Sequence, residues 1–250
     1  MKITKLLTII SILLLFSHCT EIKNDLTRAN LKGKVKSFEI KEYEVTEKFG
    51  EVIKGNPKYS TKKIYNEEGN VIEEANYNSN GDLYLRTIHK YNDSRKNESI
   101  EYSNGNLDSK TIYVYDDKEN VSEERLYSSD GNLIFKIIYI YNDEGNVGEK
   151  REYDSIGEMY SKTVYEYNKK GDHIETRSYF SDGDLHYRIT IKARDDKGSV
   201  VEWSYYNSLK DEPNENSFKN KYDKKGNWTG GIGYTNGILT TLTEVEIEYY

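Results

Sequence analysis

The sequence predicts an all-β protein: an elongated up-and-down antiparallel β-meander of about 14 strands, forming a single twisted or curled sheet. A turn of the form Tyr-Asn/Asp-x-x-Gly-Asn recurs about every 26 residues, and a period of this size is typical of repeat architectures. Asn-Gly and Asp-Gly steps, which supply the positive φ of tight hairpins, alternate with these turns. No helical 3.6-residue period persists. The repeated tyrosines are Tyr65, Tyr91, Tyr115, Tyr141, Tyr167 and, after a degenerate copy, Tyr222.

The N-terminus predicts an exported protein. Lys2 and Lys5 precede an apolar run of 11 residues over 6–16, which is typical of a signal peptide and too short to span a bilayer. The stretch 15–19 resembles a bacterial lipoprotein signal, which implies a signal peptide over 1–18 and a lipidated Cys19 at the head of a polar tether, 19–30. His18 departs from the small residue usual before the cysteine, so a plain secretory signal is the alternative. With one cysteine in the chain, no intrachain disulfide can form.

Residues 31–250 are predicted to form one domain, because no linker or change of composition interrupts them. The first hairpin is expected to begin at Val35–Val45 and to turn near Phe49. The last is expected to run from Trp228 to Tyr250 and to turn at Asn236-Gly237. Between these hairpins, segments of 7–9 residues rich in β-branched and aromatic side chains have the length of strands. Each repeat of about 26 residues therefore contributes two strands.

Aligned repeats show columns of similar residues. The fourth position of the longer strand is always basic, at Arg86, Lys110, Lys136, Lys162 and Arg188. The other strand has a Glu four residues before a Tyr, as in Glu149 and Tyr153. If both turns are three-residue loops with a bulge, Tyr141 pairs with Val147, and the Leu, Tyr and Glu columns share one face opposite the basic column. A different turn type would move one strand's columns to the other face.

Neither face of this predicted sheet is uniformly apolar. A two-sheet sandwich needs one apolar face on each sheet, so a long, twisted, partly curled single sheet is favoured, with Tyr and the stems of Lys and Arg covering its backbone. A sheet coiled enough to enclose its Tyr face is the alternative. The edge strands of an open sheet need protection, and the charged first and last hairpins could supply it.

The repeat Tyr-x-Tyr-Asn/Asp-x-x-Gly-Asn resembles the YD repeat of Rhs-type proteins and is similar to the MORN-like repeats of some bacterial antitoxin-type proteins. The segments 31–37, 222–228 and 246–250 look like the ends of uncharacterised Bacteroidota lipoproteins built from such repeats. This resemblance covers about 31–250. It implies a β-hairpin repeat fold, and it suggests a toxin-immunity or antitoxin-type component as an alternative function.

Composition argues against several classes of function. Removal of 1–18 leaves 34 Lys and Arg against 43 Asp and Glu, a charge of −9, which disfavours nucleic acid and anionic lipid as partners. His89, His173 and His186 lack the spacing of a zinc site, and no phosphate-binding loop or nucleophile motif is present. Carboxylates recur in register rather than as one unique pair, so a carbohydrate-active enzyme is the less favoured alternative. The prediction is a non-enzymatic protein without metal or cofactor.

The Asp- and Asn-rich turns allow two interpretations. They offer oxygen atoms of the kind that calcium binds, but several copies also carry lysines, so Asx turns that close hairpins are favoured.

The tyrosine columns give the sharpest functional hypothesis. Tyrosines on every second strand repeat at about 9.6 Å, close to an extended disaccharide unit, and could stack against a polysaccharide. Cross-strand packing that merely stabilises the sheet is the alternative. The candidate binding ladder comprises Tyr113, Tyr139 and Tyr165 together with Tyr115, Tyr141 and Tyr167. The predicted protein is thus an outer-membrane lipoprotein, anchored by lipid on Cys19, that presents a β-sheet surface to a protein or polysaccharide.

Overall fold

The computed structural model of the protein describes residues 24–93, 95–209 and 212–250. The predicted signal peptide and Cys19 lie outside these residues. One short helix, α1 (Asp25–Arg28), precedes sixteen strands. The strands are β1 (Val35–Lys48), β2 (Glu51–Tyr65), β3 (Val71–Tyr77), β4 (Leu83–Asn92), β5 (Arg95–Ser103), β6 (Asn106–Tyr115), β7 (Val121–Ser128), β8 (Leu133–Tyr141), β9 (Val147–Asp154), β10 (Met159–Tyr167), β11 (His173–Phe180), β12 (Leu185–Arg194), β13 (Val200–Asn207), β14 (Asn214–Tyr222), β15 (Trp228–Thr235) and β16 (Ile238–Tyr249).

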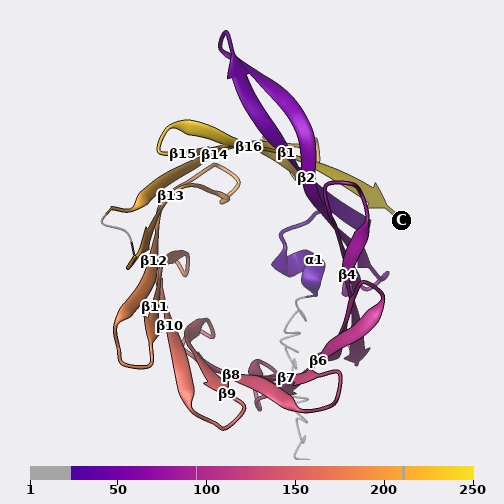
Figure 1. The fold of residues 1–250 in the computed structure, drawn as a ribbon, viewed down its shortest axis with the longest axis vertical. Helices are drawn as coiled ribbons and strands as arrows, with labels where there is room; N and C mark the ends of the chain where they lie inside the picture. The colour runs from indigo at the N-terminus through magenta and orange to yellow at the C-terminus, as the bar shows by residue number, and fades with distance from the viewer. Residues whose placement is uncertain (1–23, 94, 210–211) are drawn as a thin grey trace, which may run out of the picture.

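The strands form a closed antiparallel barrel, in which each pairs with its neighbours in sequence and β1 also pairs with β16 (Figure 1). The prediction of an open, single curled sheet of about 14 strands is therefore wrong. The two hairpins that were expected to protect free edges instead pair with each other, from Val35 opposite Tyr249 to Tyr43 opposite Leu242. Closure leaves no strand edge along the barrel wall, which removes the need for edge protection.

Asx turns close the hairpins that carry the repeated Tyr-Asn/Asp motif. In the β8–β9 turn, the amide of Asn146 donates to the Asn142 side chain at 2.8 Å, and Gly145 takes φ 79°. The β6–β7 turn repeats the geometry with Asp116 as acceptor. Oxygen atoms of these side chains thus serve their own backbone amides, which explains why Asn or Asp recurs there.

Bulges at these turns decide which side chains share a face. Tyr141 pairs with Val147, as the sequence predicted, but Ile140 pairs with Glu149, so the extra residue Gly148 shifts the register by one. Lys136 consequently lies opposite Tyr153 and Arg125. The predicted common face for the Tyr and Glu columns is therefore wrong, because the Glu149 column shares its face with the basic column.

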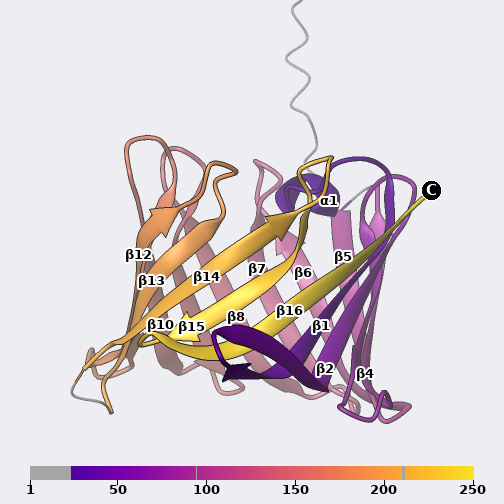
Figure 2. The same ribbon diagram turned by 90° about the horizontal axis from the view of Figure 1, so that it is seen from above.

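The apolar core is small and lies where the barrel closes. Leu26 of α1 packs with the buried Val35, Phe38, Tyr65 and Val71. The helix lies inside one mouth of the barrel (Figures 1 and 2), where the Leu26 amide donates to the Gly69 carbonyl at 3.0 Å. This seam joins the two ends of the described chain, and elsewhere the wall relies on strand pairing and polar contacts.

The two rims of the barrel differ. We call the end that holds α1 the α1 rim; it carries the β2–β3 turn and the other turns that follow even-numbered strands. The opposite end, which we call the far rim, carries the β1–β2, β3–β4 and subsequent turns that follow odd-numbered strands. The tip of the β1–β2 hairpin extends outward from the wall near the far rim (Figure 1).

Candidate functional site on the inner wall

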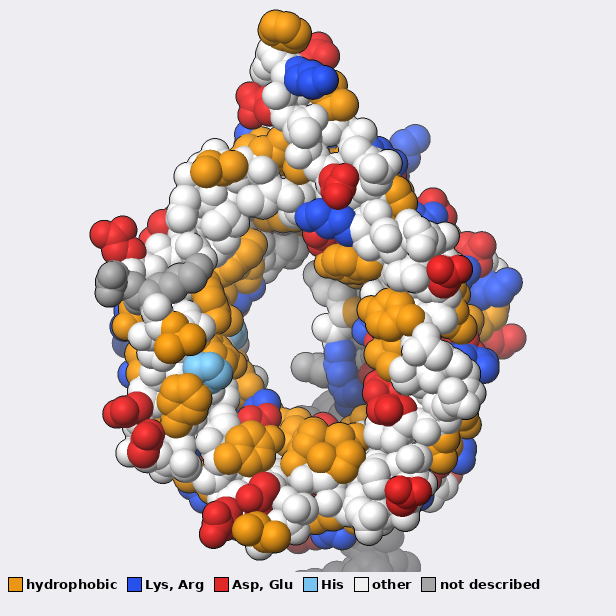
Figure 3. Space-filling view, in the orientation of Figure 1, with side chains coloured by type: hydrophobic (Ala, Val, Ile, Leu, Met, Phe, Trp, Pro, Cys, Tyr) orange, Lys and Arg blue, Asp and Glu red, His pale blue; other side chains and the backbone are white. Residues whose placement is uncertain are grey.

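The barrel encloses an open lumen, which the space-filling view shows as a central hole (Figure 3). Sixteen strands make a barrel too wide for side chains to fill, as in water-filled porins. The hydroxyl of Tyr91 donates to Asp25 of the enclosed helix at 2.9 Å, which fixes the lumen-facing side of β4. Because the other repeats share this register, their corresponding tyrosines also face the lumen.

The six predicted ladder tyrosines divide into two groups. Tyr115, Tyr141 and Tyr167 each reach back one hairpin and donate to a backbone carbonyl, at 2.8 to 2.9 Å. The acceptors are the first or second residues of earlier strands, namely Lys96, Val121 and Val147. The Tyr91 hydroxyl also lies 2.6 Å from the Val71 carbonyl, so its single proton is shared between Val71 and Asp25. These hydroxyls tie neighbouring hairpins together, so this column has a structural role.

Tyr113, Tyr139 and Tyr165 form the second group, two residues earlier on the same strands and hence on the same lumen-facing side. We call these three residues the lumen arc. Tyr113 lies 3.0 Å from the Ser99 hydroxyl, and Tyr139 donates to Glu124 at 3.0 Å. The Tyr165 ring lies 5.9 Å from the ring of His173.

All three rings of the lumen arc are half-buried. Burial is the main cause that raises their hydroxyl pKa values, to about 12 for Tyr113 and also upward for Tyr139 and Tyr165. At neutral pH the arc therefore consists of uncharged phenols, with ring faces and hydroxyl groups directed toward the lumen.

A charged network lies on the same wall beside α1. Glu74 lies 3.3 Å from Lys63 and 3.4 Å from Nε2 of His89, whose Nδ1 lies 2.7 Å from Ser99. The nearby His89 ring is the main cause that lowers the pKa of Glu74 to about 2, with Lys63 adding to it. Ser99 joins this network to Tyr113 of the lumen arc.

Lys96 and Asp25 form the other half of this charged region. Burial lowers the pKa of Lys96, and its ammonium lies 6.0 Å from the Tyr91 ring and 5.9 Å from the Tyr113 ring. Burial tends to raise the pKa of Asp25, but bonds from the Val71 amide and Tyr91 outweigh it, so the net shift is downward.

The charged residues on the inner wall were not predicted from the sequence, because the predicted Glu column consists of other acids. The Glu column represented above by Glu149 also contains Glu73 and Glu123, and it points outward: Glu73 pairs with Arg86 at 2.6 Å on the outer wall. The lumen-facing acids are the next residues, Glu74 and Glu124. The adjacent Glu-Glu pairs were visible in the sequence, but only the bulge register assigns one acid of each pair to the lumen.

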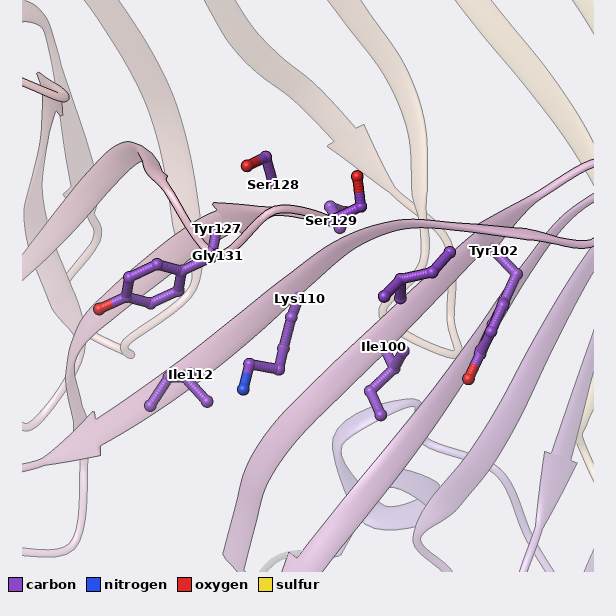
Figure 4. A pocket seen from close by; sticks show the side chains of 10 residues that line it. Ile100, Tyr102, Lys110, Ile112, Tyr127, Ser128, Ser129 and Gly131 are labelled. Atoms are coloured by element: carbon purple, nitrogen blue, oxygen red, sulfur yellow. The ribbon is translucent and has the colours of Figure 1, made fainter.

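The outer wall pairs its cations with its own tyrosines. Lys136, Lys162 and Arg188 lie 5.1, 5.6 and 5.7 Å from the rings of Tyr153, Tyr179 and Tyr206. A groove of about 540 Å³ also lies here, lined by Ile100, Tyr102, Lys110, Ile112 and Tyr127 among others (Figure 4). Its cation Lys110 already has a partner, Glu98, at 3.5 Å.

Two classes of feature are absent from the described part of the chain. No group of three or more His, Cys, Asp or Glu side chains is placed to hold a metal ion there. Nor does any helix among the described residues have the length and apolar character to cross a bilayer.

Comparison with solved structures identifies the fold class. The chain is similar to a porin-like protein from Bacteroides uniformis, with a TM-score of 0.59, 13% identity, and coverage of 86% of this chain and 98% of that one. A porin-like protein from Bacteroides vulgatus gives a TM-score of 0.37 at 12% identity, covering 88% and 99% of the two chains. The Tc holotoxin pore of Photorhabdus luminescens gives 0.23 at 12% identity, covering 76% and 12%.

The first of these likenesses shows a shared barrel fold, and the other two are too distant in shape to support an inference. No family model matches the sequence, and no curated protein matches it. The YD-repeat resemblance therefore stays a prediction.

Proposed function

We propose that this protein is a non-enzymatic binding protein of the bacterial cell envelope whose lumen holds a polysaccharide chain. The lumen arc is the observation that carries the proposal. Tyr113, Tyr139 and Tyr165 lie on alternate strands, so their rings repeat at about 9.6 Å, near the length of a disaccharide unit. Sugar rings present apolar faces that stack on aromatic rings, and Ser99 and Glu124 beside the arc can exchange hydrogen bonds with hydroxyl groups.

The lumen is favoured over the outer wall because two of its three arc rings, those of Tyr139 and Tyr165, have no cation over their faces in the described part of the chain. On the outer wall, a Lys or Arg side chain lies beside the rings of Tyr153, Tyr179 and Tyr206. A sugar would have to displace these cations before it could stack there. In the lumen arc, Lys96 lies 5.9 Å from the Tyr113 ring, whereas Lys150, the cross-strand neighbour of Tyr139, pairs with Glu152 at 2.9 Å. Among the described residues, no cation lies over the ring of Tyr139 or Tyr165.

The experiment is a titration of the purified protein with soluble dextran, xylan and polygalacturonate, measured by isothermal calorimetry. The double variant Y139A/Y165A is expected to bind the best of these at least about tenfold more weakly. The matched control, Y153A/Y179A, removes two outer tyrosines from the neighbouring strands and should change the Kd less than twofold. Thermal unfolding verifies that both variants are folded. Equal weakening in both, or no binding of any polysaccharide by the parent protein, would refute the lumenal site.

The charged outer wall favours a barrel that lies in water beside a membrane and does not span the bilayer. A lipid-facing barrel needs an apolar outer band about 25 Å tall, but this wall carries Arg125, Arg151 and Arg177 at the middle of their strands. Their partners there include Glu123, Glu149 and Glu166. We infer that the protein is held at the outer membrane by its N-terminus rather than by its strands.

Lipid on Cys19 would provide that tether. Cys19 precedes Asn24 by five residues, and Asn24 bonds to the β2–β3 turn, so the α1 rim would face the anchoring membrane. The intact mass of the mature protein from a Bacteroidota host is expected to show an N-terminal cysteine carrying acyl chains. A mature N-terminus elsewhere, or an unmodified Cys19, would remove the tether from the proposal.

A further inference from the structure

Exposed apolar side chains gather at the far rim. Four large apolar residues are 70% or more exposed: Phe49 at 106%, Leu209 at 90%, Ile156 at 78% and Ile238 at 70%. All four lie in or beside turns of the far rim. Leu83, Leu107 and Ile134, which begin strands at the same rim, are 44 to 47% exposed. Figure 3 looks onto this end of the barrel, where hydrophobic groups surround the opening.

The far-rim loops are also acidic. They contain six acids, and no base among the loop residues that the structure describes. The acids are Asp82, Asp130, Glu158, Asp182, Asp184 and Glu212. The described loops of the α1 rim also carry more acids than bases, but there six lysines stand among twelve acids. The lysines are Lys118, Lys169, Lys170, Lys197, Lys224 and Lys225. Both rims are therefore net acidic. Among the described loops, those of the far rim differ in having no base beside their acids and in carrying the four most exposed apolar side chains.

We propose that the far rim is a docking surface for a protein partner with a basic, partly apolar face. The exposed apolar side chains form a ring of separate contact points around the mouth, and the acids between them would attract a partner of opposite sign. A second copy docked rim to rim would bring the same acids together. An anionic lipid surface would be repelled in the same way.

The geometry favours recognition at low entropic cost. Phe49 and Gly50 form the tip of the long β1–β2 hairpin, with φ of 55° and 81°, so the paired turn orders the backbone that carries the exposed Phe49 ring. Ile156 follows an Asx turn in which its amide donates to Asp154 at 3.0 Å. Because the backbone of these turns is already ordered, binding would lose little conformational entropy there. The surface surrounds the mouth of the lumen but uses none of the lumen arc residues.

A defined peptide can test the chemistry of this surface. The probe is a fluorescent 18-residue amphipathic peptide of leucine and lysine, titrated with the full-length protein in detergent by fluorescence anisotropy. Replacing lysine with glutamate in the probe should abolish binding. The variant F49S/I156S/L209S is expected to raise the Kd at least about tenfold. The variant D82N/D130N/D184N should also weaken binding, and more strongly at low salt than at high salt.

The matched control removes three apolar side chains near the α1 rim, as I72S/I140S/I174S, and should leave the Kd within twofold. A Kd within twofold for F49S/I156S/L209S, or an equal loss in the control, would overturn the proposal. A dimer seen in sedimentation and abolished by the far-rim variant would assign the surface to a second copy instead. A blue shift of a tryptophan in F49W on phosphatidylglycerol vesicles would assign it to lipid. Both of these results would also overturn the proposal.

Discussion

Replacing Gly230 with alanine is expected to lower the free energy of unfolding by about 3 kcal/mol or more. Gly230 takes φ 123°, which is unfavourable for a residue with a Cβ atom. An added Cβ would clash with the carbonyl oxygen of Thr243 and would lie 2.9 Å from its carbon, both of them backbone atoms of β16. The neighbouring strand would have to move, and β16 is the strand that closes the barrel on β1.

Urea unfolding followed by circular dichroism measures this effect. The control is G131A, at a turn glycine with φ 82° whose Cβ would meet no atom within 4 Å. Its cost is expected to be about 1 to 2 kcal/mol, from backbone strain alone. If G230A proved no more destabilising than G131A, the tight approach of β15 to β16 would be contradicted. The comparison therefore separates the steric requirement of the seam from the general preference for glycine at positive φ.

The sequence predicted the local structure of this protein well, because the signals for hairpins are local. Turn residues such as Asn142 and Gly145 are recognisable from the sequence, and the predicted first pair beyond the turn, Tyr141 with Val147, is confirmed. Closure was not predictable in the same way. It depends on how twist and stagger accumulate over sixteen strands, and on contacts such as Phe38 with Ile247 between residues far apart in the chain.

The faces of the sheet were mispredicted for a single local reason. One extra residue per turn, such as Gly148, moves every later side chain of the strand to the opposite face. That shift places Glu149 outside and Lys150 inside, where Lys150 pairs with Glu152 at 2.9 Å. The candidate site was therefore only partly predictable. The tyrosine ladder was recognised, whereas the lumen-facing acids and the division of the tyrosines into two groups required the register.

The division of the tyrosines into two groups also bears on the function of the protein. The tyrosines that donate to backbone carbonyls support the alternative that was weighed against a ladder, namely that repeated tyrosines stabilise the sheet. The hydroxyl groups of Tyr113 and Tyr139 in the lumen arc bond to side chains, Ser99 and Glu124, instead of to the backbone. A repeat can thus combine a structural column and a candidate binding column two residues apart, and the sequence period alone does not distinguish them.

Acid is expected to destabilise the barrel through Glu74. Its pKa falls from 4.5 to about 2 in the folded protein, because His89 and Lys63 stabilise the carboxylate. A lowered folded pKa means that the stabilisation is fully present above the unfolded value of 4.5. It is then lost as the pH falls from 4.5 toward 2. The shift corresponds to at most about 3 kcal/mol, and partial exposure of the side chain makes about 2 kcal/mol the expected size.

The variant E74Q keeps the shape of Glu74 and removes its charge, so it isolates this contribution. At pH 7 its free energy of unfolding is expected to be about 2 kcal/mol lower than that of the parent protein. This difference should shrink steadily as the pH falls from 4.5 to 2. The control E73Q changes the neighbouring acid, which pairs with Arg86 on the outer wall, and should cost less than about 1 kcal/mol. Urea unfolding at pH 7, 4 and 3 measures the difference in free energy of unfolding between each variant and the parent protein.

A difference between E74Q and the parent protein that stayed constant with pH would show that the effect of the substitution is steric. Equal costs for E74Q and E73Q would contradict the placement of Glu74 between Lys63, His89 and Lys96 on the inner wall.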